Sequence, residues 1–472
     1  LSDNGEILVS SLVKYRVFID FDYTDPNSKK TEDRVRKRKD SIWNADVAEL
    51  SKGLSKIVPR WSAAEFEKHL RTGLNINRRR GSGRREYPLC PGPMYITYSQ
   101  YKDIKKLPIM NLSAAYSGLI AKDFIDRKKI FGSLGKSTLG DIVASEDKKG
   151  TKFNVTYGLE KKYDSLLRGK EGSGWKEKSR LRVDEPARNG VDIQTTLNVE
   201  MQDICEKALR NQLVQRDAMA GWAILMETNT GDIKAIANLE MDTADFNNYI
   251  EGSNRAVVGF EPGSVMKPIS MLIALEKGWV TPNTTLTTGN GYKYANGPAI
   301  FDCLPVKSMP VWEVIERSSN IGMTKTIMPH LEYPQQFKEC LKEIGFFEPM
   351  NLHIAGERTP RIRDLGSSNW DYIDASRMSY GYATEIPPIY TLSIYNAIAN
   401  GGKYVRPRFV SEISRDDIDS IIPVSYIRER ICSEENADIL RKMLKRVVSG
   451  EYGTAKIVGK DNKDVDIAGK TG

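Results

Sequence analysis

The sequence predicts an α+β protein in which an antiparallel sheet lies between helices, beside a mainly helical lobe and after a separate α+β domain. First, 472 residues are too many for one hydrophobic core, so two or more domains are expected. Second, strand-like stretches alternate with apolar helical stretches along the chain. Third, charge is divided: residues 1–190 hold 39 Lys+Arg and 25 Asp+Glu, a net of +14, whereas residues 191–472 hold 31 and 37, a net of −6. With a linker expected at residues 186–190, we expect one domain over 1–190 and another over 191–472.

The composition excludes several classes of protein. A hydrophobic content of 40% with 9% aromatic residues is typical of a globular protein, and no run of about 18 apolar residues predicts a membrane span. The five cysteines form no Cys-x-x-Cys pair, which argues against a zinc finger and against a thioredoxin-type redox site. We expect them to be mostly buried and unpaired, and we expect no metal and no cofactor. They are Cys90, Cys205, Cys303, Cys340 and Cys432.

The first domain shows one strand signal and two charged stretches. Residues 5–20 alternate as a strand does. A charge cluster at 29–40 precedes a helical stretch that begins at Ile42. Residues 78–85 are basic and interrupted by glycine, and we interpret them as a solvated loop. Nucleic-acid binding is disfavoured because the flanking sequence shows no known nucleic-acid-binding fold. Only one aromatic residue, Tyr87, is close enough in sequence to stack on a base.

The boundary between the domains is expected just before a strand and a capped helix. Residues 113–185 mix short strands with polar loops, and residues 186–190 read as a linker. Residues 192–197 alternate as a strand, after which Asn198 is placed to cap a helix that runs to about residue 215.

The second domain continues with a hairpin and several helices. Residues 221–227 and 232–238 form a β-hairpin pattern around a Thr-Asn-Thr-Gly turn, and this hairpin begins the predicted sheet. Helical stretches recur later in the chain, at residues 335–344, 389–399 and 436–448. The sheet and the helical lobe are expected to meet at the active site.

Residues 261–268, Glu-Pro-Gly-Ser-Val-Met-Lys-Pro, open an apolar helix that Gly278 ends. A helix that is apolar on nearly every face is expected to be central and buried. Ser264 and Lys267 are three residues apart, so they share one face at its start. Pro268 fits in the first turn, where a missing N–H costs little. A serine hydroxyl is a weak nucleophile until a base takes its proton, and a desolvated, neutral lysine can be that base.

A lone Ser-x-x-Lys pair is weak evidence, because most such pairs are chance neighbours on a solvated face. Four more pairs in this chain have the same spacing: Ser99/Lys102, Ser133/Lys136, Ser145/Lys148 and Ser173/Lys176. Only Ser264 stands at the start of a buried apolar helix, and two further motifs follow it in the chain.

The second motif is Ser318-Ser319-Asn320, which reads as a turn between two apolar helical segments. The third is Lys470-Thr471-Gly472, which follows residues 465–468, and these alternate like a strand. Two more Ser-x-Asn sequences occur. Residues 2–4 precede the nucleophile and residues 367–369 fall in a polar loop, so order and context set both aside.

These three motifs, in this order, resemble those of penicillin-binding proteins and serine β-lactamases. The resemblance to class B penicillin-binding proteins extends over residues 261–268, 317–320, 379–382 and 398–404. Within that family the chain most resembles the septal, cell-division D,D-transpeptidases. The resemblance covers 191–472 closely and 1–190 loosely. It implies a transpeptidase domain preceded by an elongated, non-catalytic pedestal domain for dimerisation or partner docking.

The resemblance also implies roles for the motif residues. Ser264 would form an acyl-enzyme, and Lys267 would be its base, with a pKa lowered by burial and by Lys470 nearby. Ser318 would relay a proton to the leaving amine, and Asn320 would orient Lys267 and the amide of the substrate.

The third motif would bind the substrate. Lys470 and Thr471 would hold its terminal carboxylate, and Gly472 would let its backbone lie against the strand, where a side chain would block it. The family continues beyond this glycine with another strand, a C-terminal helix and a second oxyanion-hole donor. We therefore expect the transpeptidase domain to be truncated at its C-terminus, with half of the oxyanion hole missing.

The implied function is a peptidoglycan D,D-transpeptidase that closes 4→3 cross-links between stem peptides, with a D-Ala-D-Ala donor and an amine acceptor. β-Lactams would inhibit it covalently. The implied partners are a membrane glycan polymerase and divisome proteins. An N-terminal anchor upstream of this chain would make it a single-pass protein of the inner membrane, with this part on the periplasmic side.

Three alternatives stay open. The elongation-specific class B transpeptidase is the main one, because it shares every motif. A serine β-lactamase would be far shorter and would need a group to activate water, such as Glu-x-x-x-Asn, and neither Glu343 nor Glu348 begins that pattern. A β-lactam sensor, which binds but does not turn over, would also be shorter.

Overall fold

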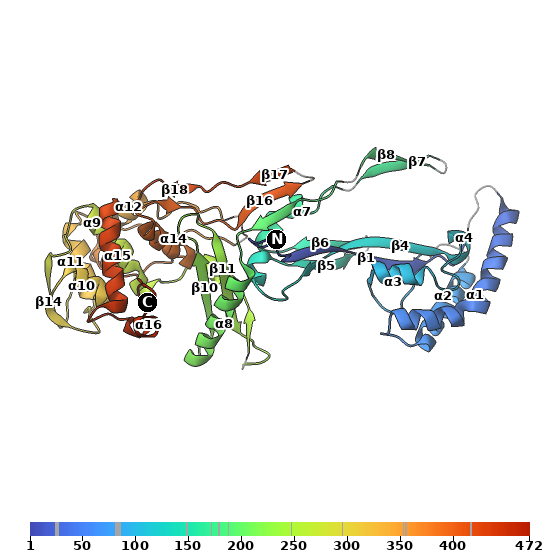
Figure 1. Ribbon diagram of the computed structural model, residues 1–472, viewed down its shortest axis with the longest axis horizontal. Coiled ribbons are helices and arrows are strands. Elements are labelled where there is room, and N and C mark those ends of the chain that lie inside the picture. Colours follow the sequence, from blue (N-terminus) through green and yellow to red (C-terminus); the bar gives the residue numbers. More distant parts are fainter. Residues whose placement is uncertain are drawn as a thin grey trace. The chain divides into compact units, whose positions relative to one another are not determined.

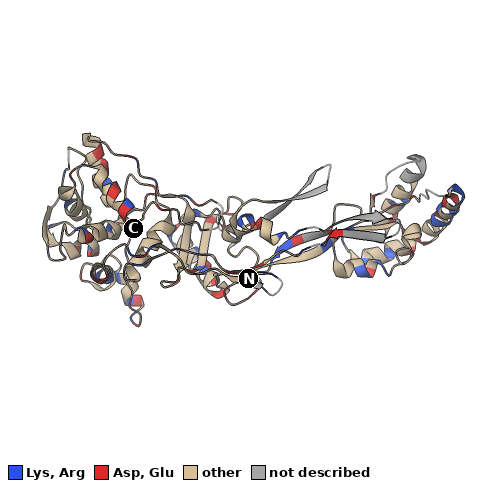
Figure 2. Cartoon of the chain, turned by 90° about the horizontal axis from the view of Figure 1, so that it is seen from above, with Lys and Arg blue, Asp and Glu red and all other residues tan. Residues whose placement is uncertain are grey.

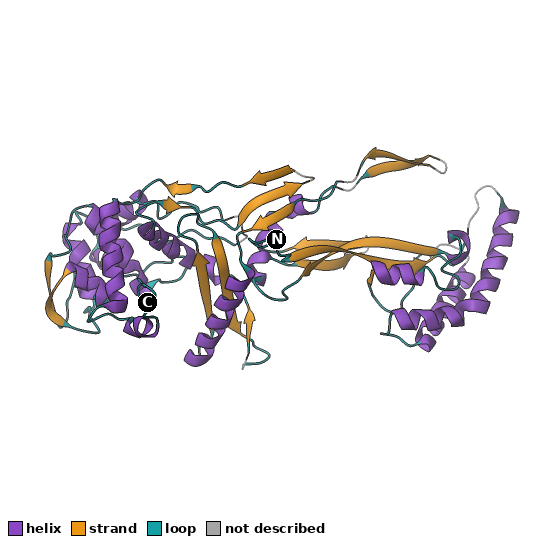
Figure 3. Cartoon of the chain, viewed as in Figure 1, coloured by secondary structure: helices purple, strands orange, loops and turns teal. Residues whose placement is uncertain are grey.

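The computed structural model (Figure 1) describes residues 1–472 except 24–27, 81–85, 148–149, 171, 178–179, 187, 247, 295, 353, 355 and 416–417. Contacts divide the chain into two units, one of residues 9–130 and one of residues 1–8 with 131–472. Each unit contains helices and strands, and every pairing between the named strands of the described residues is antiparallel (Figure 3). The predicted α+β class is confirmed.

The first unit is a sheet covered by helices. Its elements are β1 (Val9–Ile19), α1 (Lys29–Ile57), α2 (Ala63–Arg80), β2 (Tyr87–Pro88), β3 (Ile96–Thr97), α3 (Tyr98–Ile104), α4 (Ala114–Ser117) and β4 (Leu119–Lys129). The predicted strand at 5–20 is confirmed by β1, which pairs with β4 along its whole length. Trp43 and Leu50 of α1 and Phe66 of α2 are fully buried in the core of this unit.

Two predictions for this unit were wrong at the residue level. The helix predicted from Ile42 begins at Lys29, because the Ser28 side chain caps it and Arg36 pairs with Glu32 one turn away at 2.9 Å. Figure 2 shows Lys and Arg interspersed with Asp and Glu along these helices. The loop predicted at 78–85 is helical up to residue 80, in α2, and residues 81–85 lie outside the described part of the chain.

The second unit begins with small helices and hairpins and then the central sheet. These elements are α5 (Lys136–Leu139), β5 (Ile142–Asp147), β6 (Gly150–Val155), α6 (Gly158–Lys162), α7 (Asp164–Leu167), β7 (Ser173–Glu177), β8 (Arg180–Glu185), β9 (Asp192–Thr195), α8 (Val199–Arg216), β10 (Ala220–Met226), β11 (Ile233–Met241) and β12 (Tyr249–Glu251). The predicted hairpin is confirmed as β10 and β11, and the predicted strand and Asn198-capped helix are confirmed as β9 and α8.

The rest of the second unit is mainly helical. It comprises the 3₁₀ turns η1 (Arg255–Val257), η2 (Gly263–Met266) and η3 (Met328–His330), and α9 (Lys267–Glu276), β13 (Thr285–Gly289), β14 (Val306–Pro310), α10 (Val311–Glu316), α11 (Asn320–Ile327), α12 (Gln335–Glu343), α13 (Asn369–Ser379), α14 (Pro388–Ala399), β15 (Tyr404–Val405), β16 (Val410–Arg415), β17 (Ile418–Ile421), β18 (Tyr426–Arg428), α15 (Glu434–Ser449) and α16 (Lys456–Asp461). The three later helices predicted from the sequence are confirmed as α12, α14 and α15. Among the helices that the structure describes, none has both the length and the hydropathy to cross a bilayer.

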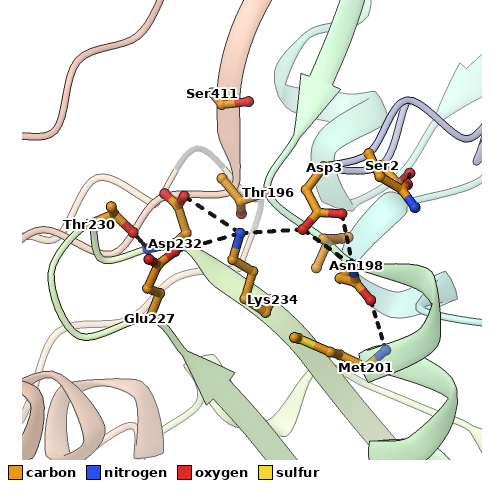
Figure 4. A network of polar contacts seen from close by, with 12 residues as sticks. Ser2, Asp3, Thr196, Asn198, Met201, Glu227, Thr230, Asp232, Lys234 and Ser411 are labelled. Carbon is orange, nitrogen blue, oxygen red and sulfur yellow. Dashed lines mark hydrogen bonds and ion pairs between the residues drawn. The ribbon is translucent and has the colours of Figure 1, made fainter.

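The first residues of the chain pair with the second unit beside β9. Leu1 accepts a backbone hydrogen bond from Thr195 at 2.9 Å, and Asp3 donates one to Leu197 at 2.8 Å. The Asp3 carboxylate also accepts from the Asn198 amide at 3.1 Å and from Lys234 at 3.3 Å (Figure 4). Residues 2–4, set aside above as a Ser-x-Asn sequence, thus connect β9, the start of α8 and the hairpin.

One local prediction near the third motif was wrong. Residues 465–468 form no strand, because this stretch lies along α15, where Asp466 pairs with Lys445 at 2.8 Å and Gly469 donates to the Leu444 carbonyl at 3.2 Å. Alternation alone does not supply a partner strand. Ser367 and Ser368 lie in the predicted polar loop, and Ser368 is the N-cap, in a capping box, of α13, which begins at Asn369.

A buried carboxylate joins α10 to α15. Glu316 is fully buried and accepts from Arg446 Nε at 2.6 Å and from the Tyr452 backbone N–H at 2.7 Å. The Arg446 guanidinium also lies over the Trp312 ring, 4.0 Å from its centroid. This contact holds α10, whose end leads into the second motif.

Glu316→Ala is expected to lower the free energy of unfolding by about 3 kcal/mol, because it leaves a guanidinium and a backbone N–H without their acceptor. This value is at the lower end of the stability losses that follow when a buried ion pair is broken, since the Arg446 side chain is 43% exposed. Urea denaturation followed by circular dichroism measures this change. The control is Glu343→Ala, which removes an exposed pair with Lys277 and is expected to cost less than about 1 kcal/mol. Equal losses in the two variants would contradict the role of Glu316.

Candidate active site

The first motif lies where η2 passes into α9, and this segment is anchored on both sides. Gly263, at φ 59°, donates its N–H to the Gly381 carbonyl at 3.0 Å. A Cβ on Gly381 would lie 1.8 Å from the Gly263 carbonyl oxygen, so only glycine allows this approach. Tyr395 donates to the Val265 carbonyl at 2.9 Å. All residues of α9 from Lys267 to Leu275 are buried, which confirms the predicted central helix.

The second motif is a turn with one residue in the left-handed region. Ser318 has φ +58°, which is uncommon for a residue other than glycine and marks a backbone held by its surroundings. Ser319 donates its N–H to the Val314 carbonyl at 3.0 Å, which closes α10, and its hydroxyl caps α11 by accepting from the Gly322 N–H at 2.8 Å. The Ser318 side chain and carbonyl consequently point toward α9.

The Lys267 amine is the centre of the site. Its Nζ lies 3.0 Å from Ser264 Oγ, 3.1 Å from Ser318 Oγ and 2.5 Å from the Ser318 carbonyl oxygen. The whole residue is inaccessible to solvent, whereas Ser264 and Ser318 are partly exposed. The structure therefore brings the first two motifs together across 51 residues of sequence.

The third motif also contacts the Ser318 hydroxyl, through Lys470. Lys470 Nζ donates to Ser318 Oγ at 2.7 Å and to its neighbour's carbonyl, that of Thr471, at 2.8 Å. Thr471 Oγ1 lies 2.7 Å from Thr454 Oγ1. A Cβ placed on Gly472 would be 3.9 Å from Val265 Cγ1, so this glycine lies beside the residue that follows Ser264.

Both lysines have lowered pKa values. The pKa of Lys267 is lowered to about 7, first by burial and second by the Lys470 ammonium, while the Asp302 carboxylate acts in the opposite direction. Burial also lowers the pKa of Lys470 to about 8. Near neutral pH a neutral amine at Lys267 thus coexists with an ammonium at Lys470.

Asn320 occupies a different place from the one expected. Its side-chain amide donates to the Phe301 carbonyl at 3.2 Å, and no hydrogen bond among the described residues joins it to Lys267. Asp302 and Thr454 also lie at this site, and no sequence pattern pointed to them. Asp302 accepts from the Ser319 hydroxyl, and Thr454 contacts Thr471. Neither residue lies in a periodic pattern or near a motif in sequence, so the sequence carried no signal for them.

The five cysteines are free, and Cys90, Cys340 and Cys432 are buried, as predicted. Cys303 is exposed, next to Asp302.

Two family models match the chain. Residues 221–472 match the penicillin binding protein transpeptidase domain, and residues 1–194 match the penicillin-binding protein dimerisation domain. The first match includes every motif residue described above.

Curated relatives and solved structures agree with these matches. The probable peptidoglycan D,D-transpeptidase PbpC of Pseudomonas aeruginosa is 28% identical over 62% of this chain and 49% of its own length. The peptidoglycan D,D-transpeptidase FtsI of Escherichia coli K12 is 27% identical over 66% of this chain and 54% of its own length. The chain thus spans about half the length of these relatives.

Penicillin Binding Protein 2X from Streptococcus thermophilus superposes with a TM-score of 0.77, at 19% identity, over 96% of this chain and 66% of that chain. At this identity the likeness concerns the fold alone. The two family models together cover both parts of the chain, and the transpeptidase model by itself covers more than half of it. The chain therefore belongs to the penicillin-binding protein family, with a transpeptidase domain preceded by a dimerisation domain, as its motifs predicted.

Proposed function

We propose that this chain is the catalytic part of a class B peptidoglycan D,D-transpeptidase. The observation that carries the proposal is the buried Lys267 amine, within hydrogen-bond distance of both Ser264 Oγ and Ser318 Oγ. This arrangement has a nucleophile, a base and a relay hydroxyl in contact with one another. The relatives named above as D,D-transpeptidases support the substrate class.

The hydrogen bonds of Lys267 explain why its neutral form is the active one. A neutral amine has two N–H groups and one lone pair. The Ser318 carbonyl only accepts, so it takes one N–H. When the lone pair accepts the Ser264 O–H, the second N–H donates to Ser318 Oγ, which also accepts from Lys470. The Ser318 O–H then remains to donate to the substrate.

In acylation, Ser264 Oγ attacks the carbonyl of the penultimate D-alanine and passes its proton to Lys267. The C–N bond breaks, and the proton passes through Ser318 to the leaving D-alanine amine. The amine of an acceptor stem then attacks the ester, loses a proton to Lys267 and returns Ser264 to its starting form. Lys470 and Thr471 would bind the carboxylate of the donor, with Gly472 beside it, and Asn320 would hold the substrate amide. A β-lactam would acylate Ser264 in the same way.

We also propose that the cross-links are of the 4→3 type and that they are made at the septum. The motif resemblance to septal enzymes supports this role. Residues 1–190 would form a non-catalytic domain for dimerisation or for docking to a glycan polymerase and divisome proteins, and 191–472 the transpeptidase domain. A membrane anchor outside this chain would hold it on the periplasmic side of the inner membrane.

Treatment with a fluorescent penicillin is expected to modify Ser264 and no other serine, because Ser264 contacts the buried amine of Lys267, three residues along the chain. Intact mass and peptide mapping locate the adduct. Ser264→Ala is expected to abolish labelling, whereas Ser133→Ala, in another Ser-x-x-Lys pair, retains it. An adduct on Ser133, or labelling that survives in Ser264→Ala, would contradict the assignment of Ser264 as the nucleophile.

Lys267→Ala is expected to slow acylation by roughly 10²–10⁴-fold, because it removes the group that takes the serine proton. Stopped-flow fluorescence measures the second-order rate constant, and a melting curve checks that the variant is folded. The matched control is Lys277→Ala, at the exposed end of the same helix, where the lysine pairs with Glu343. A folded Lys267→Ala protein that reacts at the wild-type rate would show that another base acts.

The acylation rate is expected to depend on pH as a bell. It rises through about pH 7 as Lys267 loses its proton, and it falls above about pH 8 as Lys470 loses its own. The same stopped-flow assay across pH gives both limbs. In Lys470→Arg the falling limb is expected to move to higher pH, since a guanidinium stays charged. A rate independent of pH across both limbs would contradict these assignments.

A further inference from the structure

Asp302, from the loop before β14, directs its carboxylate at the start of α11. Its Oδ1 accepts from the Asn320 N–H at 2.6 Å and from the Ile321 N–H at 3.1 Å. Its Oδ2 accepts from the Ser319 hydroxyl at 2.5 Å. One side chain, distant in sequence, thus binds three consecutive residues of the second motif and of the helix that follows it.

These contacts fix the backbone on one side of Ser318. The first N–H groups of a helix have no acceptor within the helix, and a carboxylate there is favoured by the helix dipole. Asp302 supplies that acceptor, while the preceding residue, Phe301, accepts from the Asn320 side chain at 3.2 Å. Ser318 lies between the end of α10 and this bound start of α11, in its left-handed conformation.

The same carboxylate acts on the base. The charged and titratable groups that affect Lys267 are Lys470, Asp302 and Cys303, and the last two favour its protonated form. Removing the charge of Asp302 would therefore lower the pKa of Lys267. Loosening the site would instead admit water and raise that pKa toward its ordinary value. The two effects on the pKa of Lys267 have opposite signs. The direction in which the rising limb of the pH profile moves therefore shows which effect is larger.

We propose that Asp302 is a positioning residue for acylation, which holds Ser318 and Asn320 in place through the start of α11 and adds its negative charge to the field at Lys267. This inference rests on the proposed transpeptidase function.

The test is Asp302→Asn, which keeps the shape of the side chain and loses its charge and one acceptor atom. The acylation rate constant at saturating penicillin is expected to fall by about 10–100-fold, as a small misplacement of catalytic groups produces. The non-covalent affinity for the penicillin is expected to change little. The rising limb of the pH profile is expected to move to lower pH.

A second readout does not depend on activity. Hydrogen exchange of the Asn320 and Ile321 amides is expected to be roughly tenfold faster in Asp302→Asn, because the acceptor of both hydrogen bonds loses its charge. The matched control is Asp371→Asn. This residue contacts the N-cap Ser368 of α13, after the other Ser-Ser-Asn sequence, at 2.5 Å. The control is expected to leave the acylation rate, its pH profile and exchange in α11 unchanged.

A wild-type rate constant in Asp302→Asn, or unchanged exchange at the start of α11, would overturn the positioning role. A rising limb that moves to higher pH would overturn the contribution of the Asp302 charge, because the admitted water would then outweigh the lost charge. A wild-type protein that forms no penicillin adduct would contradict the proposed function instead. Exchange in α11 would then decide alone whether Asp302 holds the second motif.

Discussion

The structure of the catalytic unit depends on one buried amine. Lys267 is inaccessible to solvent, and its Nζ has three oxygen neighbours, two of them hydroxyl groups. A buried ammonium is costly unless its partners replace water, and here only one partner is an obligatory acceptor. The balance therefore favours a neutral amine near neutral pH. The same burial that would destabilise a charged lysine suits this lysine to the proposed role of a base.

The surrounding fold keeps that amine in place by restricting the backbone on each side. The motif serine Ser264 begins a helix that is buried along its length, and Gly381 lets the preceding loop approach closely. Ser318 is held in the left-handed region between the end of α10 and the start of α11. Glu316, fully buried, ties α10 to α15 through Arg446.

Two side chains of opposite charge, Lys470 and Asp302, act on the Lys267 amine. Lys470, the second cation, shares the Ser318 hydroxyl with Lys267 and disfavours a second positive charge beside it. Asp302 lies behind the second motif and acts in the opposite direction. The pKa of Lys267 therefore reflects burial first and the difference between two nearby charges second. Because the two lysines have lowered pKa values of about 7 and about 8, a neutral Lys267 and a cationic Lys470 coexist over a narrow pH range.

The sequence by itself determined the features that depend on neighbours within one helical turn or one hairpin: the buried helix with Ser264 and Lys267 on one face, the Asn198 cap and the β10–β11 hairpin. It also determined the family, because three motifs in order are rarely accidental. Tertiary structure decided the rest. Contacts that span 51 and 152 residues bring Ser318 and Lys470 to the amine, and no local pattern encodes them. Asp302 carried no signal, and the alternation at 465–468 predicted a strand that is absent, because a strand needs a partner edge that only packing can supply.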